Sequence, residues 1–375
     1  NKNESPYRES IRQISWINKT MLFCLHCHPN NQSDDITQII LEFDNNGQIQ
    51  KKIFENTIHF TNFLRRLYYN PTYDIILCET NEGSIHKVII DHNDPNHAEH
   101  FLVSETPIVS LPEVCNWIGT VQLESEKNKG VFVIGLSEHN KLYVNENLIA
   151  ADCTSFIIHN DFIIFTTLSH VVRFLPLHAN LLDLKVLDSV IQPYDETVRR
   201  VERGSKIVCA AYYDVFLVLQ MPRGNLETIY PRALVLASVR DFLNKCDYSS
   251  AYKACRKHRI DLNILHDHSP DLFLKNVQSF VTQIKKVDYL NLFLSSLRNE
   301  DVTVTMYPQI GDSSKSSSNS HDVSTKVNTV CDAVRAVLES MDTKIYLQSI
   351  ITSYVRKTPP DLESALNLLA KLKGL

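Results

Sequence analysis

Cys24 and Cys27 form the most metal-like pair in the chain, with His26 and His28 beside them. A Cys-x-x-Cys pair supplies half of a tetrahedral zinc site. No second Cys-x-x-Cys occurs in the sequence to complete such a site. Because the segment also has the pattern of a strand, whose alternate residues face opposite sides, we favour a structural role over a metalloenzyme centre that uses these side chains.

A second group of imidazole and carboxylate side chains has the ligand types that hold a divalent ion. It consists of Asp91, His92, Asp94, His97, Glu99 and His100. Asn93 and Pro95 interrupt the group, and such polar stretches with turn residues are typical of exposed loops. We therefore predict a loop at this position, and we expect neither a metal nor another cofactor in the chain.

His266, Asp267 and His268 could serve as general acids or bases if a nucleophile stood nearby. Nothing in the sequence identifies that nucleophile, and Ser269-Pro270 follows as a helix start, with Pro at the first helical position. We predict that these polar side chains satisfy helix ends. The chain also lacks phosphate-binding loops, a His-Glu-x-x-His motif and a Gly-x-Ser-x-Gly elbow, so we predict no enzyme activity and no catalytic residues.

Lys253, Arg256, Lys257 and Arg259 concentrate positive charge at the end of a predicted helix. Cations at this end complement the helix dipole without any ligand. They could also contact RNA phosphates or an acidic partner, each phosphate contact adding salt-dependent affinity. The solvated helix end is the favoured interpretation, and an RNA or partner contact is the alternative.

The elements that position these residues change in kind along the chain. Up to about residue 228, short β-branched and aromatic runs alternate with turn residues, as in 162–167 (FIIFTT), which indicates half-buried strands. Asn-Asn-Gly at 45–47 predicts a hairpin between strands at 38–43 and 48–53, and Asn-Glu-Gly at 81–83 predicts one between strands at 73–78 and 84–90. Further strands are predicted at 21–26, 131–136, 141–144, 155–159, 171–175, 206–210 and 215–220.

Antiparallel strands that repeat every 40 to 45 residues or so are typical of β-propeller blades, and the first 228 residues have room for about five of them. We predict a WD40-like propeller that is incomplete or has irregular blades, although the usual Gly-His and Trp-Asp dipeptides are absent. A pair of β-sandwiches is the alternative architecture.

The second part of the chain repeats in threes and fours, which indicates helices. They are predicted at 233–246, 248–258 with Asp247 as N-cap, 270–284, 287–298, 323–341 and 343–357. A last helix is predicted to bury Leu362, Ala365, Leu366, Leu369 and Leu372. Paired helices without intervening strands indicate a TPR-like α-solenoid.

These patterns predict a propeller part at 1–228, the first solenoid repeats at 229–310 and further solenoid helices at 325–375. The Ser-rich segment 311–324 between them lacks the apolar residues needed for a packed element, so we predict a disordered loop. Phosphorylation of this loop is an alternative to a plain solvated linker.

Charge and cysteine content bound the cellular setting. Residues 1–228 carry a net charge of −9 and residues 229–375 a net charge of +4, so the helical part is the better candidate to approach an anion or an acidic partner. Nine cysteines without framework spacing predict reduced thiols in a cytoplasmic or nuclear protein. No apolar run predicts a membrane span or a signal peptide, and we expect the chain to be a piece of a longer protein.

A family resemblance begins where the strands give way to helices. It is carried by 222–236 (PRGNLETIYPRALVL), 251–263 (AYKACRKHRIDLN), 266–270 (HDHSP), 291–293 (NLF), 300–303 (EDVT) and 306–308 (MYP). In combination these segments resemble the largest subunit of the Elongator complex. That family has two N-terminal propellers followed by a helical-repeat arm, and this chain resembles the later propeller part and the first repeats.

The resemblance implies a non-catalytic scaffold that holds a second propeller subunit and a catalytic subunit with radical-S-adenosylmethionine and acetyltransferase-like domains. The assembly begins 5-carboxymethyl modification of the wobble uridine (U34) in tRNA. The family's basic RNA-contacting segment and its homodimer region lie further toward the C-terminus, so they assign no role to residues of this chain. A membrane-coat or vesicle-transport scaffold, which also joins propellers to α-solenoids, is the alternative function.

Overall fold

A computed structural model of the chain describes residues 10–17, 19, 21–27, 34–43, 47–60, 63–91, 100–104, 106–124, 129–177, 181, 195–211, 214–308 and 323–373. It contains two compact units. The first comprises residues 1–158, 162–169 and 177–189, and the second comprises 159–161, 170–176 and 190–375. Within the described ranges, no helix combines the length and the apolar character that a bilayer crossing requires.

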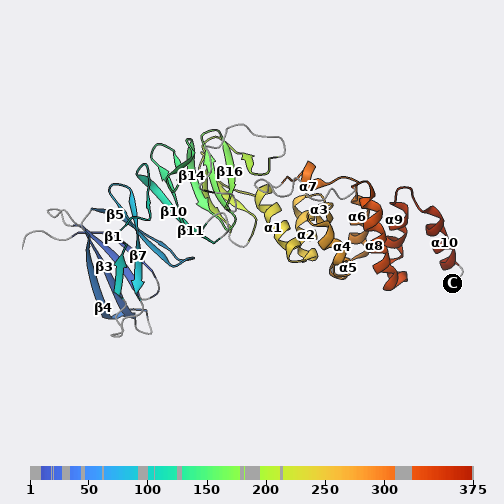
Figure 1. Cartoon of the computed structure of the whole chain (residues 1–375), viewed down its shortest axis with the longest axis horizontal. Coiled ribbons are helices and arrows are strands. Elements are labelled where there is room, and N and C mark those ends of the chain that lie inside the picture. The colour runs from blue at the N-terminus through green and yellow to red at the C-terminus, as the bar shows by residue number, and fades with distance from the viewer. Residues whose placement is uncertain are drawn as a thin grey trace, which may run out of the picture. The chain divides into compact units, whose positions relative to one another are not determined.

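The described strands form consecutive antiparallel groups, as expected for propeller blades (Figure 1). The first group is β1 (Ser10–Trp16), β2 (Met21–Cys27), β3 (Asp34–Phe43) and β4 (Ile49–Phe60). The second is β5 (Leu64–Asn70), β6 (Ile75–Thr80), β7 (Ser84–Asp91) and β8 (His100–Val103), with β9 (Val109–Ser110) also paired to β7. The third is β10 (Cys115–Glu124), β11 (Lys129–Ser137), β12 (Leu142–Val144) and β13 (Asn147–Ala150).

The fourth group is divided between the units. In the first unit β14 (Cys153–Ile158) pairs with β15 (Phe162–Thr167), and in the second β16 (Val171–Pro176) pairs with β17 (Val198–Arg200). The second unit also contains the fifth group, β18 (Lys206–Ala210), β19 (Leu217–Gln220) and β20 (Leu226–Ile229). Antiparallel groups of this size confirm the predicted propeller architecture rather than the pair of β-sandwiches.

In the first unit, apolar side chains fill the space between successive sheets. Phe23 and Leu25 of β2 pack with Leu67 of β5 and Cys78 of β6, so the first two sheets share one core. Leu77 and its neighbours on β6 and β7 pack with Cys115, Val133 and Tyr143 of the third group in a second core. The first strands of these groups also contact one another in series, β1 with β5 and β5 with β10. This is the packing expected where blades meet around a propeller axis.

Helices follow in the second unit. They are α1 (Arg232–Asn244), α2 (Tyr248–His258), α3 (Ile264–Asp267), α4 (Pro270–Lys275), α5 (Val277–Ile284), α6 (Val287–Ser296), α7 (Val302–Thr305), α8 (Lys326–Ser340), α9 (Thr343–Val355) and α10 (Leu362–Lys373). A short 3-10 helix, Val323–Thr325, precedes α8. Helix α1 contacts α2, α2 contacts α5, α5 contacts α8, and α9 contacts both α8 and α10 (Figure 1). This serial packing is that of the predicted α-solenoid.

One aromatic cluster forms the centre of the helical core. Phe273, Phe280 and Phe293 lie with ring centroids 4.9 to 5.9 Å apart, and Tyr248 meets the first two edge to face. All four side chains are almost completely buried. Rings at these distances and angles add favourable quadrupole contacts to the burial of apolar area. Residues from α2, α4, α5 and α6 are thereby fixed to one another.

One helix prediction is wrong, and two short helices were missed. The helix expected over 270–284 is two helices, because Asn276 leaves helical geometry (φ −113°, ψ 19°) and its side-chain amide donates to the Leu272 carbonyl at 2.8 Å. Helices α3 and α7 were not predicted, since four residues are too few for a periodic pattern. Asp247 is the N-cap of α2, as predicted, and accepts a hydrogen bond from the Ser250 N–H at 3.1 Å.

The predicted burial of α10 is wrong for three of the four leucines that it named. Leu362, Leu366 and Leu369 are 55%, 64% and 39% exposed, whereas Ala365 is 5% exposed. Helix α10 contacts α9, and its Leu368 packs against the helical core. The side chain of Leu372 lies outside the described residues, as does the Ser-rich segment as far as His321 and Asp322.

Candidate functional site

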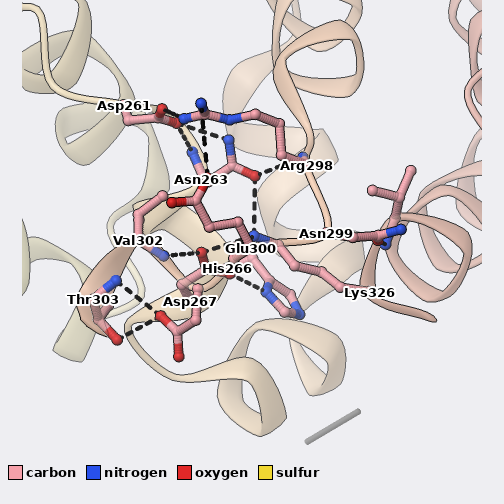
Figure 2. A network of polar contacts seen from close by, with 12 residues as sticks. Asp261, Asn263, His266, Asp267, Arg298, Asn299, Glu300, Val302, Thr303 and Lys326 are labelled. Carbon is pink, nitrogen blue, oxygen red and sulfur yellow. Dashed lines mark hydrogen bonds and ion pairs between the residues drawn. The ribbon is translucent and has the colours of Figure 1, made fainter. Parts of the chain in front are cut away.

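Three residues of the family-like segment, the stretch 222–308 that carries the family resemblance, bind one buried amine (Figure 2). Lys326 at the start of α8 donates to the Asn263 side-chain oxygen at 3.0 Å, to the Glu300 carbonyl at 2.7 Å and to the Asp267 carboxylate at 2.7 Å. An ammonium group has three N–H donors, so each one has an acceptor. Lys326 is only 6% exposed, and burial of this charge is tolerable because it is paired and fully hydrogen-bonded.

The Asp267 carboxylate is shared among three donors. Besides Lys326, it accepts the Val302 backbone N–H at 3.0 Å, at the start of α7, and it lies 2.8 Å from Nδ1 of His266. The imidazole of His266 packs edge to face on Phe273 and is itself buried. These contacts join α3, α7 and α8, and they agree with the prediction that the His266-Asp267 pair satisfies helix ends. No acid/base role is needed to explain them.

Asn263 ties the same site to the end of α6. Its side-chain NH2 donates to Asp261 at 2.7 Å and to the Ser296 carbonyl at 2.8 Å, while its oxygen accepts the Arg298 backbone N–H at 3.0 Å. Together with the bond from Lys326, these contacts use the hydrogen-bonding capacity of the amide in full. Asn263 has no exposed surface, and Arg298 also pairs with the Asp261 carboxylate.

Tyr307 extends these contacts to α1. Its hydroxyl accepts the Asp261 N–H at 2.9 Å, and burial raises the pKa of this phenol above its ordinary value, so it stays protonated. Its carbonyl accepts from Arg240 at 3.1 Å. The same guanidinium binds both carboxylate oxygens of Glu196, at 2.8 and 3.1 Å, which is the bidentate geometry of a strong charge-assisted pair.

These residues therefore form a polar lock: Asp261, Asn263, Asp267 and Tyr307 from the family-like segment, with Lys326 and Arg240 reaching in from α8 and α1. Sequence reasoning selected His266 and Asp267 but missed the two cations. Lys326 does give a signal, because it falls in register with Val330 and Val334 of the buried helix face. A charged residue on such a face requires a buried partner.

The metal-like clusters of the sequence are placed only in part. Cys24 lies in β2, is 3% exposed and packs with Leu22, as a core residue does. The side chains of Cys27 and His28 lie outside the described residues. Residues 92–99 of the second cluster also lie outside them. At the two ends of that cluster, Asp91 of β7 pairs with His100 of β8 through the backbone. Among the side chains that are described, no three His, Cys, Asp or Glu residues approach one another closely enough to hold a metal ion.

The four predicted contact residues Lys253, Arg256, Lys257 and Arg259 are all exposed on α2 and the residue that ends it. Two of them lie over tyrosine rings: Arg256 is 4.9 Å from the Tyr289 centroid, and the Lys257 amine is 5.4 Å from the Tyr230 centroid. Burial and the adjacent Lys257 charge lower the pKa of His258, so this histidine is neutral at neutral pH. The positive charge here is therefore that of lysine and arginine alone.

Two protein-family models match the chain. Residues 1–208 match the ELP1 N-terminal second β-propeller, and residues 232–375 match the ELP1 α-solenoid. The second match begins at Arg232, the first residue of α1. The solenoid match thus begins where the structure changes from strands to helices, and the propeller match ends within β18.

Curated relatives agree with these matches. The chain is 41% identical to a putative elongator complex protein 1 of Xenopus laevis over 84% of its own length and 26% of the relative's. It is 42% identical to elongator complex protein 1 of Schizosaccharomyces pombe, over 72% of the chain and 21% of that protein. The Saccharomyces cerevisiae protein of the same name is 33% identical over 98% of the chain and 28% of its own length.

The chain thus spans roughly a quarter of the length of these relatives. The first four antiparallel groups fall in the propeller match and the helices in the solenoid match, whereas β19 and β20 lie between the two matched regions. Together these findings show that the chain belongs to the Elongator complex protein 1 family, of which it comprises second-propeller and α-solenoid sequence.

Proposed function

We propose that this chain is part of a non-catalytic scaffold subunit of the Elongator complex. In this role it organises a catalytic subunit, with radical-S-adenosylmethionine and acetyltransferase-like domains, and a second propeller subunit. The assembled complex begins 5-carboxymethyl modification of wobble uridine in tRNA, in the cytoplasm or the nucleus. The proposal rests on two observations. The chain belongs to the family, and the residues of its polar lock are hydrogen-bonded to one another.

The polar lock is the observation that carries a structural rather than a catalytic role. A general acid or base in an enzyme must come within hydrogen-bond reach of the proton that it exchanges with a substrate. Here the Lys326 ammonium uses all three donors within the protein, the Asn263 amide makes four bonds, and Asp267 accepts from both backbone and side chains. Such a site fixes helices against one another, which is what a rigid platform for partner proteins requires.

The cysteines support the same interpretation. Burial raises the pKa of the Cys78, Cys115, Cys153 and Cys255 thiols to about 12 in each case. A thiol with such a pKa is protonated at neutral pH and is a poor nucleophile. These four residues pack as small apolar side chains between sheets or helices.

Deletion of the parent gene tests the proposal. Cells without the gene should lose 5-carboxymethyl-type wobble uridine, measured by mass spectrometry of total tRNA, and a wild-type copy should restore it. A tagged full-length parent protein should also co-purify the catalytic subunit. Unchanged modification in the deletion strain would contradict the proposal, and co-fractionation with vesicles instead would favour the membrane-coat alternative.

A second experiment tests the absence of catalysis. The purified chain should turn over no substrate of the pathway, with or without S-adenosylmethionine or acetyl-coenzyme A. Turnover that a single substitution in the polar lock abolishes, such as Asp267→Asn, would assign chemistry to this chain and overturn the scaffold role.

A further inference from the structure

A group of exposed cations at the end of α2 is not explained by the polar lock. It consists of Lys253, Arg256, Lys257, Arg259 and, from the loop before α6, Lys286, and is called here the α2 basic surface. Arg256 and Lys286 lie over the same tyrosine ring, at 4.9 and 5.2 Å from the Tyr289 centroid, so Lys286 belongs to the same surface as the α2 cations. The end of α2 and the residue just before α6 thus present charge on one surface.

These charges are oriented but not neutralised. A tyrosine ring attracts a cation through its quadrupole and carries no net charge, so the contacts with Tyr230 and Tyr289 position the cations without cancelling them. Within the described part of the chain, none of the five cations makes an ion pair with a carboxylate. The nearby Asp261 is held by Arg298 instead.

The surroundings of this surface differ from those of a protein-docking site. Protein interfaces usually have an apolar centre inside a polar rim. Within 231–291, a stretch that is described throughout, no large apolar side chain is exposed, and the exposed apolar side chains next to it in sequence are Tyr230 (43%) and Leu292 (42%). An occupant would therefore be held by charge, which suits a polyanion better than a folded protein.

Tyr230 adds a feature that distinguishes among polyanions. Its ring is 43% exposed and lies next to the Lys257 amine and the His258 imidazole, whose centroid is 5.2 Å away. Exposed aromatic rings beside cations are the platforms on which unpaired bases stack while the cations bind the backbone. A duplex offers no unpaired base, whereas an RNA loop does.

We propose that the α2 basic surface binds the phosphate backbone of an RNA loop, with Tyr230 available to an unpaired base. The inference deepens the proposed function and rests on it for the choice of RNA as the nucleic acid. The binding is electrostatic, so it falls as salt rises, by about 0.7 in log affinity per log salt for each phosphate contact to a single strand.

The test measures binding of the whole chain to a fluorescein-labelled RNA stem-loop by fluorescence anisotropy over a series of salt concentrations. The variant Lys253→Gln/Arg256→Gln/Lys257→Gln removes three charges of the α2 basic surface. Its matched control, Lys206→Gln/Lys275→Gln/Lys344→Gln, removes three exposed lysines of the same unit elsewhere. Thermal melting of both variants checks that each remains folded.

We expect the first variant to bind about tenfold or more weakly at low salt, with a salt slope shallower by about 2, and the control to bind within about twofold of wild type. Tyr230→Leu should weaken binding to the stem-loop but not to its duplex counterpart. Equal losses in variant and control would overturn the inference. So would competition by a polyglutamate peptide as effective as unlabelled RNA, which would indicate an acidic protein partner.

Failure of this inference is distinguishable from failure of the proposed function. Co-purification of the catalytic subunit with the parent protein does not depend on RNA, and it is measured with the same triple variant. Intact assembly without RNA binding by the wild-type chain would overturn the RNA surface alone.

Discussion

Lys326 and Asp267 form a buried ion pair with a separation of 2.7 Å, and each residue is only 6% exposed. They stand 59 positions apart, on either side of the Ser-rich segment. The pair therefore holds the start of α8 to α3 and α7, and the solenoid repeats on the two sides of that segment are joined by charge as well as by apolar packing. Buried pairs of this kind cost desolvation and are most informative when one partner is removed.

Lys326→Met should destabilise the helical unit by about 3 to 5 kcal/mol, because it leaves the Asp267 carboxylate buried without its cation. Urea unfolding followed by far-ultraviolet circular dichroism measures the loss. The control is Lys344→Met on α9, which removes an exposed amine and should change the unfolding free energy by less than about 0.5 kcal/mol.

A double-mutant cycle separates the ion pair from the rest of the site. Asp267→Asn keeps an acceptor for the Val302 N–H but removes the charge, so Lys326→Met/Asp267→Asn should cost less than the sum of the two single changes. Coupling of about 1 to 3 kcal/mol is expected for groups in direct contact. Strict additivity would mean that the two charges do not stabilise each other.

Arg240→Lys tests the fork of bonds between α1 and Glu196. Lysine keeps the charge but cannot bind both carboxylate oxygens and the Tyr307 carbonyl at once, so we expect a loss of about 1 to 3 kcal/mol in the same unfolding experiment. Arg223→Lys, at an exposed turn, is the matched control and should be neutral. Equal stability of Arg240→Lys and wild type would show that the fork adds nothing beyond its charge.

The fold was predictable from local patterns to the extent that its elements are periodic. The Asn81-Glu82-Gly83 turn joins β6 to β7 as predicted, and Gly83 has the positive φ (87°) that favours glycine. The first strand of several groups was missed. In β5, Arg65 and Arg66 break the apolar alternation because both bind Asn116, which lies about 50 positions away in the next group.

The candidate site was predictable only where its residues are neighbours in sequence. His266 and Asp267 stand next to a helix start, so their role at helix ends followed from position. The partners Lys326 and Arg240 come from other helices, and no local pattern pairs them with Asp267 or Glu196 across 59 and 44 positions. Such pairs depend on tertiary packing, which brings the helices together first.

The stability of the α8–α9 pair should depend on Asp332 at acid pH. Partial burial alone would raise the pKa of Asp332, but hydrogen bonds from Lys357 and Arg335 outweigh this and hold it below its ordinary value. A carboxylate whose pKa is lower in the folded state than in the unfolded state stabilises the fold at pH values above its unfolded pKa, which is about 3.9 for aspartate. This stabilisation is lost as the pH falls through the folded pKa.

Asp332→Asn should therefore be less stable than wild type at neutral pH, and the difference should disappear as the pH falls below the lowered folded pKa of Asp332. Urea midpoints measured along a pH series test this sign. Glu227→Gln on β20 removes an exposed carboxylate that has no ion pair among the described residues, and its difference from wild type should stay small at every pH. A gap for Asp332→Asn that widened toward acid would contradict the assignment.

Gly135 tests how closely β10 and β11 approach in the first unit. A Cβ atom at Gly135 would lie 2.6 Å from Sγ and 3.1 Å from Cβ of Cys115, and 3.1 Å from Cδ1 of Leu111. Gly135→Ala should therefore destabilise this unit by about 1 to 3 kcal/mol through overpacking. Gly130→Ala is not a suitable control, because a φ of 118° strains any L side chain at that position.

Cys115→Ala distinguishes overpacking from a loss of backbone freedom at Gly135. Removal of the sulfur opens the space that the new methyl group would occupy, so Gly135→Ala/Cys115→Ala should be more stable than Gly135→Ala alone, although Cys115→Ala by itself leaves a small cavity. Thermal unfolding of the three variants and wild type provides the comparison. The opposite result is that Cys115→Ala costs the same stability in the Gly135→Ala background as in wild type. That result would show that close contact with Cys115 is not the reason for glycine at position 135.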